Sequence, residues 1–517
     1  MQHFLSGEVT PPVRRWPRVT LLTGLGLVLG WLLLSIPAAR LPEPVNPHKK
    51  PFSWNDDPRW FALEQRFREL RAEGCEGGAA ERIDVALRQG RRLVDAVGAR
   101  AWGPDAAIFD TLEAGTFALG PMIAACPQRL GDYIHLVTRT RSLVKRQSQG
   151  WDVTMQPTRD RMYRLLFGGR AALEEVMLQD SMRSRPSLVL ADDEPSQTPF
   201  ARILGVSVHS GDFLVSRGGA QVSALIAVGN DYAGNFSHVA LVYVDDKTSL
   251  ASVIESRPKT GVAVHPLEEY LGDVKLRVMV LRLRADLPAL KTEPMIPHKA
   301  AALALADARS RRIPYDVEMD LQDDKRMNCS EVVSSAYRKV GIRLWMGMSS
   351  ISSPGVTSWL AAMGVRHFET QEPSDLEYDP QVRVVAEWRD PETLFMDHVD
   401  NVVTEAMLRN AQRGERLTYP WYILPLGRLA KVYSSVLQAF RFAAPIPEDM
   451  SADAALRVLS FNTIHTAIRR RVLVRAEEFR QQQGYVAPEW ELLEFANQAK
   501  GNYLTLGGYL AALREQL

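Results

Sequence analysis

The chain has 517 residues, of which 46% are hydrophobic and 24% are charged, values that are ordinary for globular proteins. This length gives room for two to four domains. The 62 basic residues nearly balance the 61 acidic ones, for a net charge of +1. That balance excludes recruitment of nucleic acid by the field of the whole chain.

An uncharged apolar segment, residues 19–36, is the first element of the chain. A helix of this length would reach about 27 Å, close to the ~30 Å hydrocarbon thickness of a bilayer. A cleaved signal peptide is the alternative, but the run exceeds a typical signal core and Pro37-Ala38-Ala39 is a poor cleavage site. We therefore expect a single transmembrane anchor over residues 19–39.

Basic residues predict the orientation of this anchor. Three arginines lie just before the apolar segment, and one arginine follows it closely. Because basic residues concentrate on the cytoplasmic side of a membrane span, we expect residues 1–18 to be a cytoplasmic tail and the bulk of the chain to lie outside. Prolines between residues 40 and 56 indicate a stiff spacer that leads away from the membrane.

Residues 57–183 have the pattern of a helical domain. Apolar residues recur at helical spacing at its start, at Trp60, Leu63, Phe67 and Leu70. The segment also holds two of the three cysteines, Cys75 and Cys126. If Cys329 is a free thiol, these two could form a disulfide in an oxidising compartment, or they could be two unrelated buried thiols.

A β-hairpin is predicted further along the chain. Residues 238–244 and 250–254 are apolar and β-branched, and the polar residues 245–248 between them suit a turn. Pairing about the centre of that turn places His238 directly opposite Glu255, on the same face. The carboxylate would then fix the imidazole tautomer and leave the other ring nitrogen free as a base. A register slip of one residue would put the two side chains on opposite faces.

A helix that begins with a cysteine is predicted from residue 328. Asn328 is a good N-cap residue, and Glu331 completes a capping box. Cys329 falls at the first helical position, where the macrodipole lowers a thiol pKa and backbone N–H groups could stabilise an oxyanion. Gly341 stops the run. A buried stripe lies between these ends, at Val332, Val333, Ala336, Tyr337 and Val340.

The hairpin and the helix are expected to meet in space as a thiol site of Cys329, His238 and Glu255. The structural alternatives are that Cys329 is a small core residue, that His238 is structural, and that Glu255 is a solvated strand end. His265, which follows a third predicted strand, is the rival third residue of the site.

Four short motifs stand in a fixed order in this part of the chain. They are Gly211-Asp212, Ser237-His238-Val239, Ile254-Glu255 and Cys329-Ser330-Glu331-Val332. Their order resembles the permuted papain-like hydrolases of the YiiX type, relatives of the NlpC cell-wall peptidases and of lecithin:retinol acyltransferase. The resemblance implies that Cys329 is the nucleophile, His238 the general base and Glu255 the polar third residue, with Pro314-Tyr315-Asp316 as the segment before the nucleophile. It also implies hydrolysis of amides, with cell-envelope peptides or acylated lipids as the substrate class.

Proline-rich stretches flank the segment that carries these motifs. Residues 183–199 and 373–391 predict two boundaries, so we expect a papain-like domain over residues 200–372 and a helical domain over residues 392–517. The last domain has an apolar stripe at helical spacing, at Leu429, Tyr433, Val436, Leu437 and Phe440. We expect this stripe to pack in a core, with docking on a membrane surface as the alternative.

No cofactor and no metal site is predicted. The ten histidines include no His-x-x-x-His pair, the cysteines have no paired spacing, and no nucleotide-binding fingerprint occurs. Five carboxylates gather between Asp316 and Asp324, but the glycine and the final glutamate of a calcium loop are missing. We therefore expect a solvated loop there.

These patterns predict an α+β protein in which two helical regions flank a central domain behind an N-terminal transmembrane helix. The resemblance implies that the central domain is a permuted papain-like core, an antiparallel sheet plus a nucleophile helix. We expect a thiol hydrolase of the amidase or peptidase type in the bacterial inner membrane, with its bulk in the periplasm. Its expected substrate is a peptide, amide or acyl-lipid of the cell envelope. The rivals are a thiol acyltransferase or lipid esterase, and a non-catalytic envelope scaffold.

Overall fold

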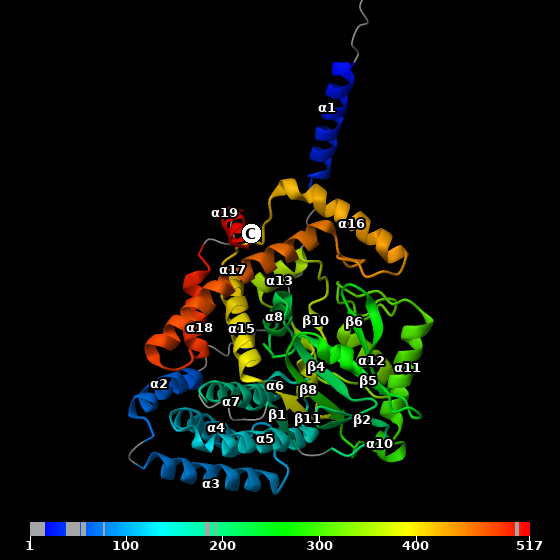
Figure 1. The fold of residues 1–517 in the computed structure, drawn as a ribbon. Coiled ribbons are helices and arrows are strands. Elements are labelled where there is room, and N and C mark those ends of the chain that lie inside the picture. The colour runs from blue at the N-terminus through cyan, green and yellow to red at the C-terminus, as the bar shows by residue number, and fades with distance from the viewer. Residues whose placement is uncertain are drawn as a thin grey trace, which may run out of the picture.

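The computed structural model describes the chain at residues 16–37, 52, 58–75, 78–180, 187–191, 194–501 and 506–516. Most of the predicted cytoplasmic tail and all but one residue of the predicted spacer lie outside these described residues. In the rest of the chain, helices from both ends of the sequence pack around one central sheet (Figure 1).

The central sheet has seven strands in the order β1-β11-β8-β4-β5-β6-β7, and every neighbouring pair is antiparallel. Its strands are β1 (Leu188–Leu190), β4 (Phe213–Gly218), β5 (His238–Val244), β6 (Ala251–Arg257), β7 (Gly261–Pro266), β8 (Lys275–Leu283) and β11 (Val382–Trp388). Two smaller sheets pair β2 (Phe200–Ile203) with β3 (Val206–His209), and β9 (Ser349–Ser350) with β10 (Glu369–Thr370).

The inner strands are nearly continuous apolar runs because both faces of the sheet are covered. On β4, Phe213 and Val215 belong to the core that contains Cys329, while Leu214 belongs to a separate core on the other face. Seven helices accompany these strands: α8 (Gln221–Val228), α9 (Leu267–Gly272), α10 (Pro288–Thr292), α11 (Ile296–Ser310), α12 (Cys329–Lys339), α13 (Pro354–Ala362) and α14 (Asp375–Tyr378).

Two strands of the sheet lie in stretches that the sequence marks as domain boundaries. β1 falls within residues 183–199, and β11 falls within residues 373–391. The prolines at 373, 380 and 391 flank β11 instead of interrupting it, so the strand can pair on both sides, with β1 and β8. The sheet therefore extends past residue 372, where the sequence predicted the papain-like domain to end.

The N-terminal helical region covers one side of the sheet. Its elements are α2 (Pro58–Glu73), α3 (Ala79–Gly98), α4 (Ile108–Ala125), η1 (Pro127–Arg129), α5 (Leu130–Gln147), η2 (Ser148–Gly150), α6 (Gln156–Tyr163), η3 (Arg164–Gly168) and α7 (Gly169–Leu178). The apolar residues predicted at the start of this region are buried in its core.

A disulfide joins Cys75, after α2, to Cys126, after α4, and so realises one of the two alternatives that the sequence left open. The loop that it closes spans 51 residues. We expect replacement of both cysteines by alanine to lower the free energy of unfolding by roughly 2–4 kcal/mol, since the cross-link restricts the unfolded chain. Urea unfolding would measure this loss. A reductant should lower the stability of the parent protein by a similar amount, and stability that is unchanged by both treatments would contradict the expectation.

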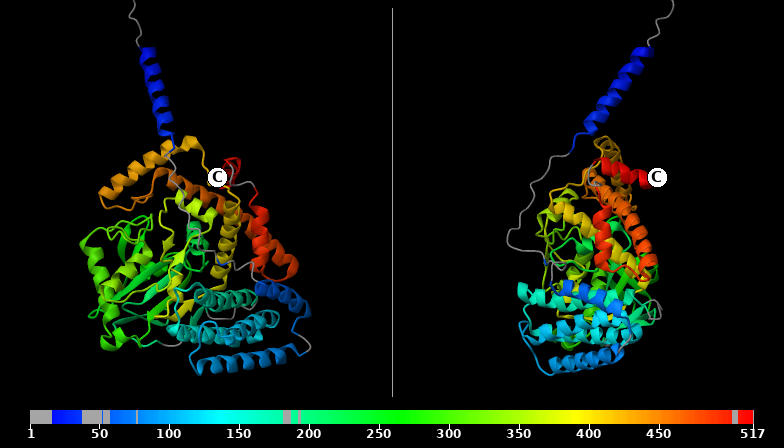
Figure 2. Two further views of the ribbon diagram at one scale, coloured as in Figure 1. Left: turned by 180° about the vertical axis from the view of Figure 1, so that it is seen from behind. Right: turned by 90° about the vertical axis from the view of Figure 1, so that its left-hand side faces the viewer.

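The C-terminal helical region packs against the sheet and the first helices. Its elements are α15 (Pro391–Gln412), η4 (Trp421–Ile423), α16 (Leu424–Ala439), α17 (Ala452–Gln483), α18 (Glu489–Ala499) and α19 (Leu506–Gln516). The first helix of the chain, α1 (Trp16–Leu34), stands out from the body, and α16 lies across its base (Figures 1 and 2). Among the residues that the structure describes, no helix is both long and apolar enough to cross a membrane.

The expectation that the apolar stripe of α16 packs in a core is wrong. Leu429 is 57% exposed, Tyr433 59%, Val436 50% and Phe440 70%, and only Leu437 of the predicted stripe is half-buried. The helix instead buries its opposite face, which carries Leu424, Gly427, Ser434 and Gln438, along α17. Helical spacing alone predicted an amphipathic helix correctly, but it did not indicate which of the two faces would be covered.

Charged side chains lie buried where the sheet meets the helices. Arg277 of β8, which alternates with apolar residues in the sequence, binds Glu174 of α7 at 2.7 Å and Asp397 of α15 at 2.6 Å. Arg217 of β4 binds the same Asp397 at 3.0 Å. Since each carboxylate belongs to a different helical region, these ion pairs join both regions to the sheet.

Candidate active site

The helix α12 begins as the sequence predicts. Asn328 Oδ1 accepts the backbone N–H groups of Ser330 at 2.9 Å and Glu331 at 3.1 Å. Glu331 Oε2 accepts the N–H of Asn328 at 2.8 Å, which completes the capping box. The predicted stripe from Val332 to Tyr337 is buried, and Gly341, with φ +80°, follows the end of the helix.

Cys329 is the first residue of α12 and lies in the core beneath β5 and β6. The backbone N–H of Val239, on β5, donates a hydrogen bond to its sulfur. Because the capping box occupies the amides of Ser330 and Glu331, the backbone N–H of Cys329 is the group in this turn that remains for an oxyanion. The first turn thus offers fewer oxyanion donors than the sequence suggested.

His238, the first residue of β5, makes two hydrogen bonds through its imidazole. Its Nε2 lies 2.5 Å from Glu255 Oε2 on β6, and the ring also hydrogen-bonds the Cys329 thiol. Because Nε2 is directed at Glu255, Nδ1 is the ring nitrogen that is left to interact with the thiol. The structure therefore brings Cys329, His238 and Glu255 together, and the imidazole lies between the sulfur and the carboxylate.

The register that brings Glu255 beside His238 differs from the predicted one. On β5 and β6, Leu241 pairs with Ile254, so that the strands are shifted by two residues from the expected pairing. Continued along the strands, this register puts Glu255 opposite Ala240 and diagonal to His238. A two-residue shift keeps every side chain on its face, so the carboxylate still reaches the imidazole.

The two-residue shift originates in the turn between the strands. The turn is longer than the four polar residues that the sequence suggested, because the N–H of Asp245 donates to the carbonyl of Leu250 at 3.0 Å. Asp245 Oδ1 accepts the N–H groups of Lys247 and Thr248, and Ser249 adopts φ +56°. These local bonds enlarge the turn and move its centre by one residue.

The electrostatics of the three residues favour a thiolate beside an imidazolium. Burial opposes the charged form of His238, but hydrogen bonds to Cys329 and Glu255 raise its pKa to about 9. Burial likewise opposes ionisation of Cys329, yet the hydrogen bond and the charge of His238 bring the pKa of the thiol below its usual value. Burial would raise the pKa of Glu255 as well, and His238 and Arg257 lower it to about 2.

Arg257 and Tyr270 support this arrangement and were not predicted from the sequence. Arg257 binds the second carboxylate oxygen of Glu255 at 2.6 Å. Tyr270, on α9, places its ring 6.4 Å from the His238 ring and donates its hydroxyl to Ser216 Oγ at 2.8 Å. The alternation of side chains along β6 could have indicated Arg257, which lies two residues after Glu255. Tyr270 comes from a separate helix and gives no comparable signal.

The Gly211-Asp212 motif holds the nucleophile helix against the sheet. Gly211 has φ +97°, and a Cβ there would overlap Pro297 of α11, so glycine is required. Its carbonyl accepts the hydroxyl of Tyr337, on α12, at 2.7 Å. Asp212 binds Arg282 of β8 at 2.8 Å. The motif thus positions the site without reaching it.

The segment before the nucleophile lies next to the thiol. The carbonyl of Pro314 accepts the N–H of Met327 at 3.0 Å. Burial is the main cause of the raised pKa of Tyr315, and the nearby thiolate charge of Cys329 raises that pKa further. Asp316, in the predicted solvated loop, is buried, and its carboxylate accepts the N–H groups of Glu318 and Asp320. Hydrogen bonds from the loop backbone to the Asp316 carboxylate therefore hold this part of the loop, and it is not fully solvated.

His265, the rival third residue, makes a different contact. It lies on β7 opposite Val253, and its Nδ1 is 3.0 Å from Glu269 Oε1. Glu255 and not His265 therefore accompanies His238.

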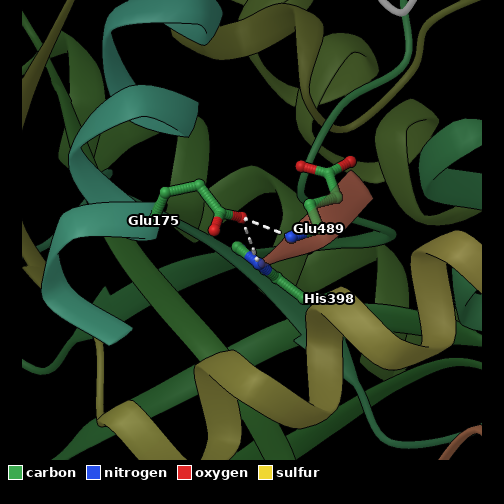
Figure 3. Close-up of side chains that lie close together, drawn as sticks. All are labelled: Glu175, His398 and Glu489. Atoms are coloured by element: carbon green, nitrogen blue, oxygen red, sulfur yellow. Dashed lines mark hydrogen bonds and ion pairs between the residues drawn. The ribbon is translucent and has the colours of Figure 1, made fainter. Parts of the chain in front are cut away.

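Within the described residues, one group of potential metal ligands comes together, and it lies outside the thiol site. Glu175 of α7, His398 of α15 and Glu489 of α18 bring ligand atoms within 4.8 Å of one another (Figure 3). His398 Nδ1 is 3.3 Å from Glu175, and Nε2 is 3.4 Å from Glu174. Burial disfavours its charge, but these two carboxylates raise the pKa of His398 well above its usual value. In the structure the His398 imidazole is paired with the carboxylates of Glu174 and Glu175, which is the arrangement of a buried ion pair.

The segment that carries the thiol site matches a known protein family. Residues 207–386 match the family model described as permuted papain-like amidase enzyme, YaeF/YiiX, C92 family. The matched segment contains Cys329, His238 and Glu255 and ends within β11. No curated protein and no solved structure matched the chain. The resemblance drawn from the four sequence motifs is confirmed for these residues, and it supports a hydrolase.

Proposed function

We propose, from the match of residues 207–386 to permuted papain-like amidases, that the chain is a cysteine hydrolase in which Cys329, His238 and Glu255 carry the chemistry. The observation that supports these roles is that the His238 imidazole interacts with both the Cys329 thiol and the Glu255 carboxylate, with Nε2 at 2.5 Å from Glu255. This is the arrangement of a nucleophile, a base and a group that orients the base.

The proposed reaction is acyl transfer through a thioester. His238 takes the proton of Cys329, and the thiolate attacks the carbonyl carbon of an amide or ester. The tetrahedral oxyanion accepts the backbone N–H of Cys329, and the imidazolium gives its proton to the leaving amine or alcohol. In the second half, His238 takes a proton from water, the hydroxide attacks the thioester, and the thiolate leaves as the carboxylic acid is released.

Glu255 and Arg257 have supporting roles in this scheme. The Glu255 carboxylate holds the Nε2–H tautomer of His238, so that Nδ1 faces the thiol, and it stabilises the imidazolium. Arg257 holds the carboxylate through its other oxygen and keeps it ionised. Arg257 acts through Glu255 and is therefore a positioning residue.

The proposed substrates are amides or acylated molecules of the cell envelope, and the proposed location is the outer face of the bacterial inner membrane. The basic residues before the apolar segment of residues 19–36 support that orientation. An acyltransferase or a lipid esterase would use the same thioester. Products formed in the presence of an added amine or alcohol distinguish a transferase, which consumes the acceptor, from a hydrolase, which releases the free acid.

Alkylation with iodoacetamide tests the proposed thiol site and separates it from a non-catalytic scaffold. The thiolate is the form of cysteine that reacts, and the pKa of Cys329 is lowered, so Cys329 is expected to label fast at neutral pH. As the pH rises, the labelling rate should reach its maximum below the usual pKa of a thiol. The imidazolium partner persists until the pH approaches about 9, the pKa of His238. Labelling followed by peptide mass analysis over a pH series measures this profile.

The test variant for this experiment is His238→Ala, and the matched control is Lys339→Ala. In His238→Ala, burial of Cys329 without its partner should raise the thiol pKa, and labelling at neutral pH should slow by roughly 10- to 100-fold. Lys339 lies at the exposed end of the same helix, and its replacement should leave the profile unchanged. Slow labelling of the parent that is insensitive to His238→Ala would favour the scaffold.

A further inference from the structure

The exposed face of α16 is an apolar surface at one end of the molecule. It consists of Leu426, Leu429, Val432, Tyr433, Val436 and Phe440, which are between 50% and 70% exposed. We call these six residues the α16 face. A contiguous exposed patch of this kind marks an interaction site, because a folded chain gains by covering it.

The α16 face is continuous with a second exposed apolar element, the helix α1. Leu25 is 64% exposed, and Leu33 is 58% exposed. The guanidinium of Arg428, on α16, donates to the carbonyl of Leu34 at 2.9 Å and to that of Ile36 at 2.6 Å, which fixes the end of α1 to α16. In all three views α16 lies across the base of α1, at the end of the body from which α1 emerges (Figures 1 and 2).

The chemistry of this end of the molecule matches a lipid surface. A bilayer can cover a helix that lies flat in its interface and, at the same place, an apolar helix that rises from that interface. Trp421 and Tyr422, 55% and 46% exposed, precede α16. Indole and phenol rings favour the boundary between acyl chains and headgroups.

A basic cavity beside the end of α16 supplies the charge that an anionic bilayer needs. It has a volume of about 230 Å³ and lies between α16 and the loop that follows α11. Five basic residues line it, against the single carboxylate of Glu448, which Arg312 binds at 2.7 Å. They are Lys259, Arg309, Arg311, Arg312 and Arg441. In a chain of net charge +1, this excess is a local concentration of positive charge.

We propose that the α16 face docks on an anionic phospholipid bilayer, with its six apolar residues among the acyl chains and the basic cavity against the headgroups. Tyr315, from the segment before the nucleophile, lines the same cavity. Docking therefore holds the thiol site close to the lipid surface.

The test places a polarity-sensitive fluorophore on the α16 face of the full chain. Val432 and, as the control, Val85 are each changed to cysteine in a Cys329→Ser background, where the disulfide leaves no other free thiol. Val85 is an exposed valine of α3, at the end of the molecule opposite α16 (Figure 1). Both labelled chains are bound to vesicles of phosphatidylcholine with phosphatidylglycerol and recovered by flotation.

On the floated protein, the probe at position 432 is expected to shift to the blue and to be quenched by nitroxide-labelled lipid, whereas the probe at position 85 stays in water. A probe at position 432 that remains in water on floated protein would overturn the proposal, since α1 alone then binds the lipid. A blue shift without vesicles that grows with protein concentration would also overturn it and would assign the face to a second copy of the chain.

Arg441→Gln tests the contribution of the basic cavity. Removal of one charge should lower the docking equilibrium of the position-432 probe by roughly fivefold on anionic vesicles and leave it unchanged on phosphatidylcholine alone. Arg92→Gln, on the exposed side of α3, is the matched control and should have no effect. Equal effects of the two variants, or none from Arg441→Gln, would overturn the assignment of the cavity to anionic headgroups.

Discussion

Cys329→Ala is expected to lower the rate of hydrolysis of an activated aryl ester on the order of 10⁴-fold or more, because it removes the atom that forms the acyl-enzyme. Loss of a member of a nucleophile–base unit costs nearly the whole catalytic effect of that unit. The measurement is the initial rate of ester cleavage at saturating substrate. Arg338→Ala serves as the control, since Arg338 lies on the exposed last turn of the same helix and its side chain is 62% exposed.

The Cys329→Ala protein should keep its fold, because the cysteine side chain is small and the capping box of Asn328 and Glu331 stays intact. Thermal unfolding of Cys329→Ala close to that of the parent checks this point. A Cys329→Ala protein that keeps the parent rate would assign the chemistry to another group, and an Arg338→Ala protein that loses it would indicate general damage to the helix.

Asp397→Ala is expected to lower the free energy of unfolding by about 3–5 kcal/mol. Asp397 is fully buried and pairs with both Arg217 and Arg277, which are also buried. Removing the carboxylate leaves two guanidinium groups without their shared partner in a medium that solvates charge poorly. Urea unfolding gives the loss in stability.

An exposed ion pair provides the comparison. Asp95 binds Arg139 at 2.7 Å, but its side chain is 64% exposed, so Asp95→Ala should cost less than about 1 kcal/mol. Similar losses for Asp397→Ala and Asp95→Ala would mean that the buried network contributes no more than a surface pair.

Local chemistry explains which parts of the site were predictable from the sequence. The beginning of α12 depends on Asn328, Cys329 and Glu331, which are close in the chain, and the structure has the capping box that their spacing predicts. The register of the hairpin was predicted wrongly because Asp245 closes a longer turn. The prediction that His238 and Glu255 lie close together was nevertheless correct, because a shift of two residues leaves each side chain on the same face of the sheet.

Contacts between distant segments explain what the sequence did not indicate. Arg277 looks like a solvated residue on an alternating strand, and its burial depends on Glu174 and Asp397, each more than a hundred residues away. The amphipathic pattern of α16 predicts a helix with two faces, but the sequence does not show that α17 covers the polar-lined face. Prolines at 373, 380 and 391 suggested a boundary, whereas they bracket the strand β11.

The most direct test of a Cys329 nucleophile activated by His238 is capture of the acyl-enzyme. Acid quenching of the protein during turnover of an activated ester, followed by peptide mass analysis, should show the acyl group on the peptide that contains Cys329. The adduct should be released by hydroxylamine and should form far more slowly in His238→Ala. Steady turnover without an adduct on that peptide, or an adduct that forms equally fast in His238→Ala, would contradict the account.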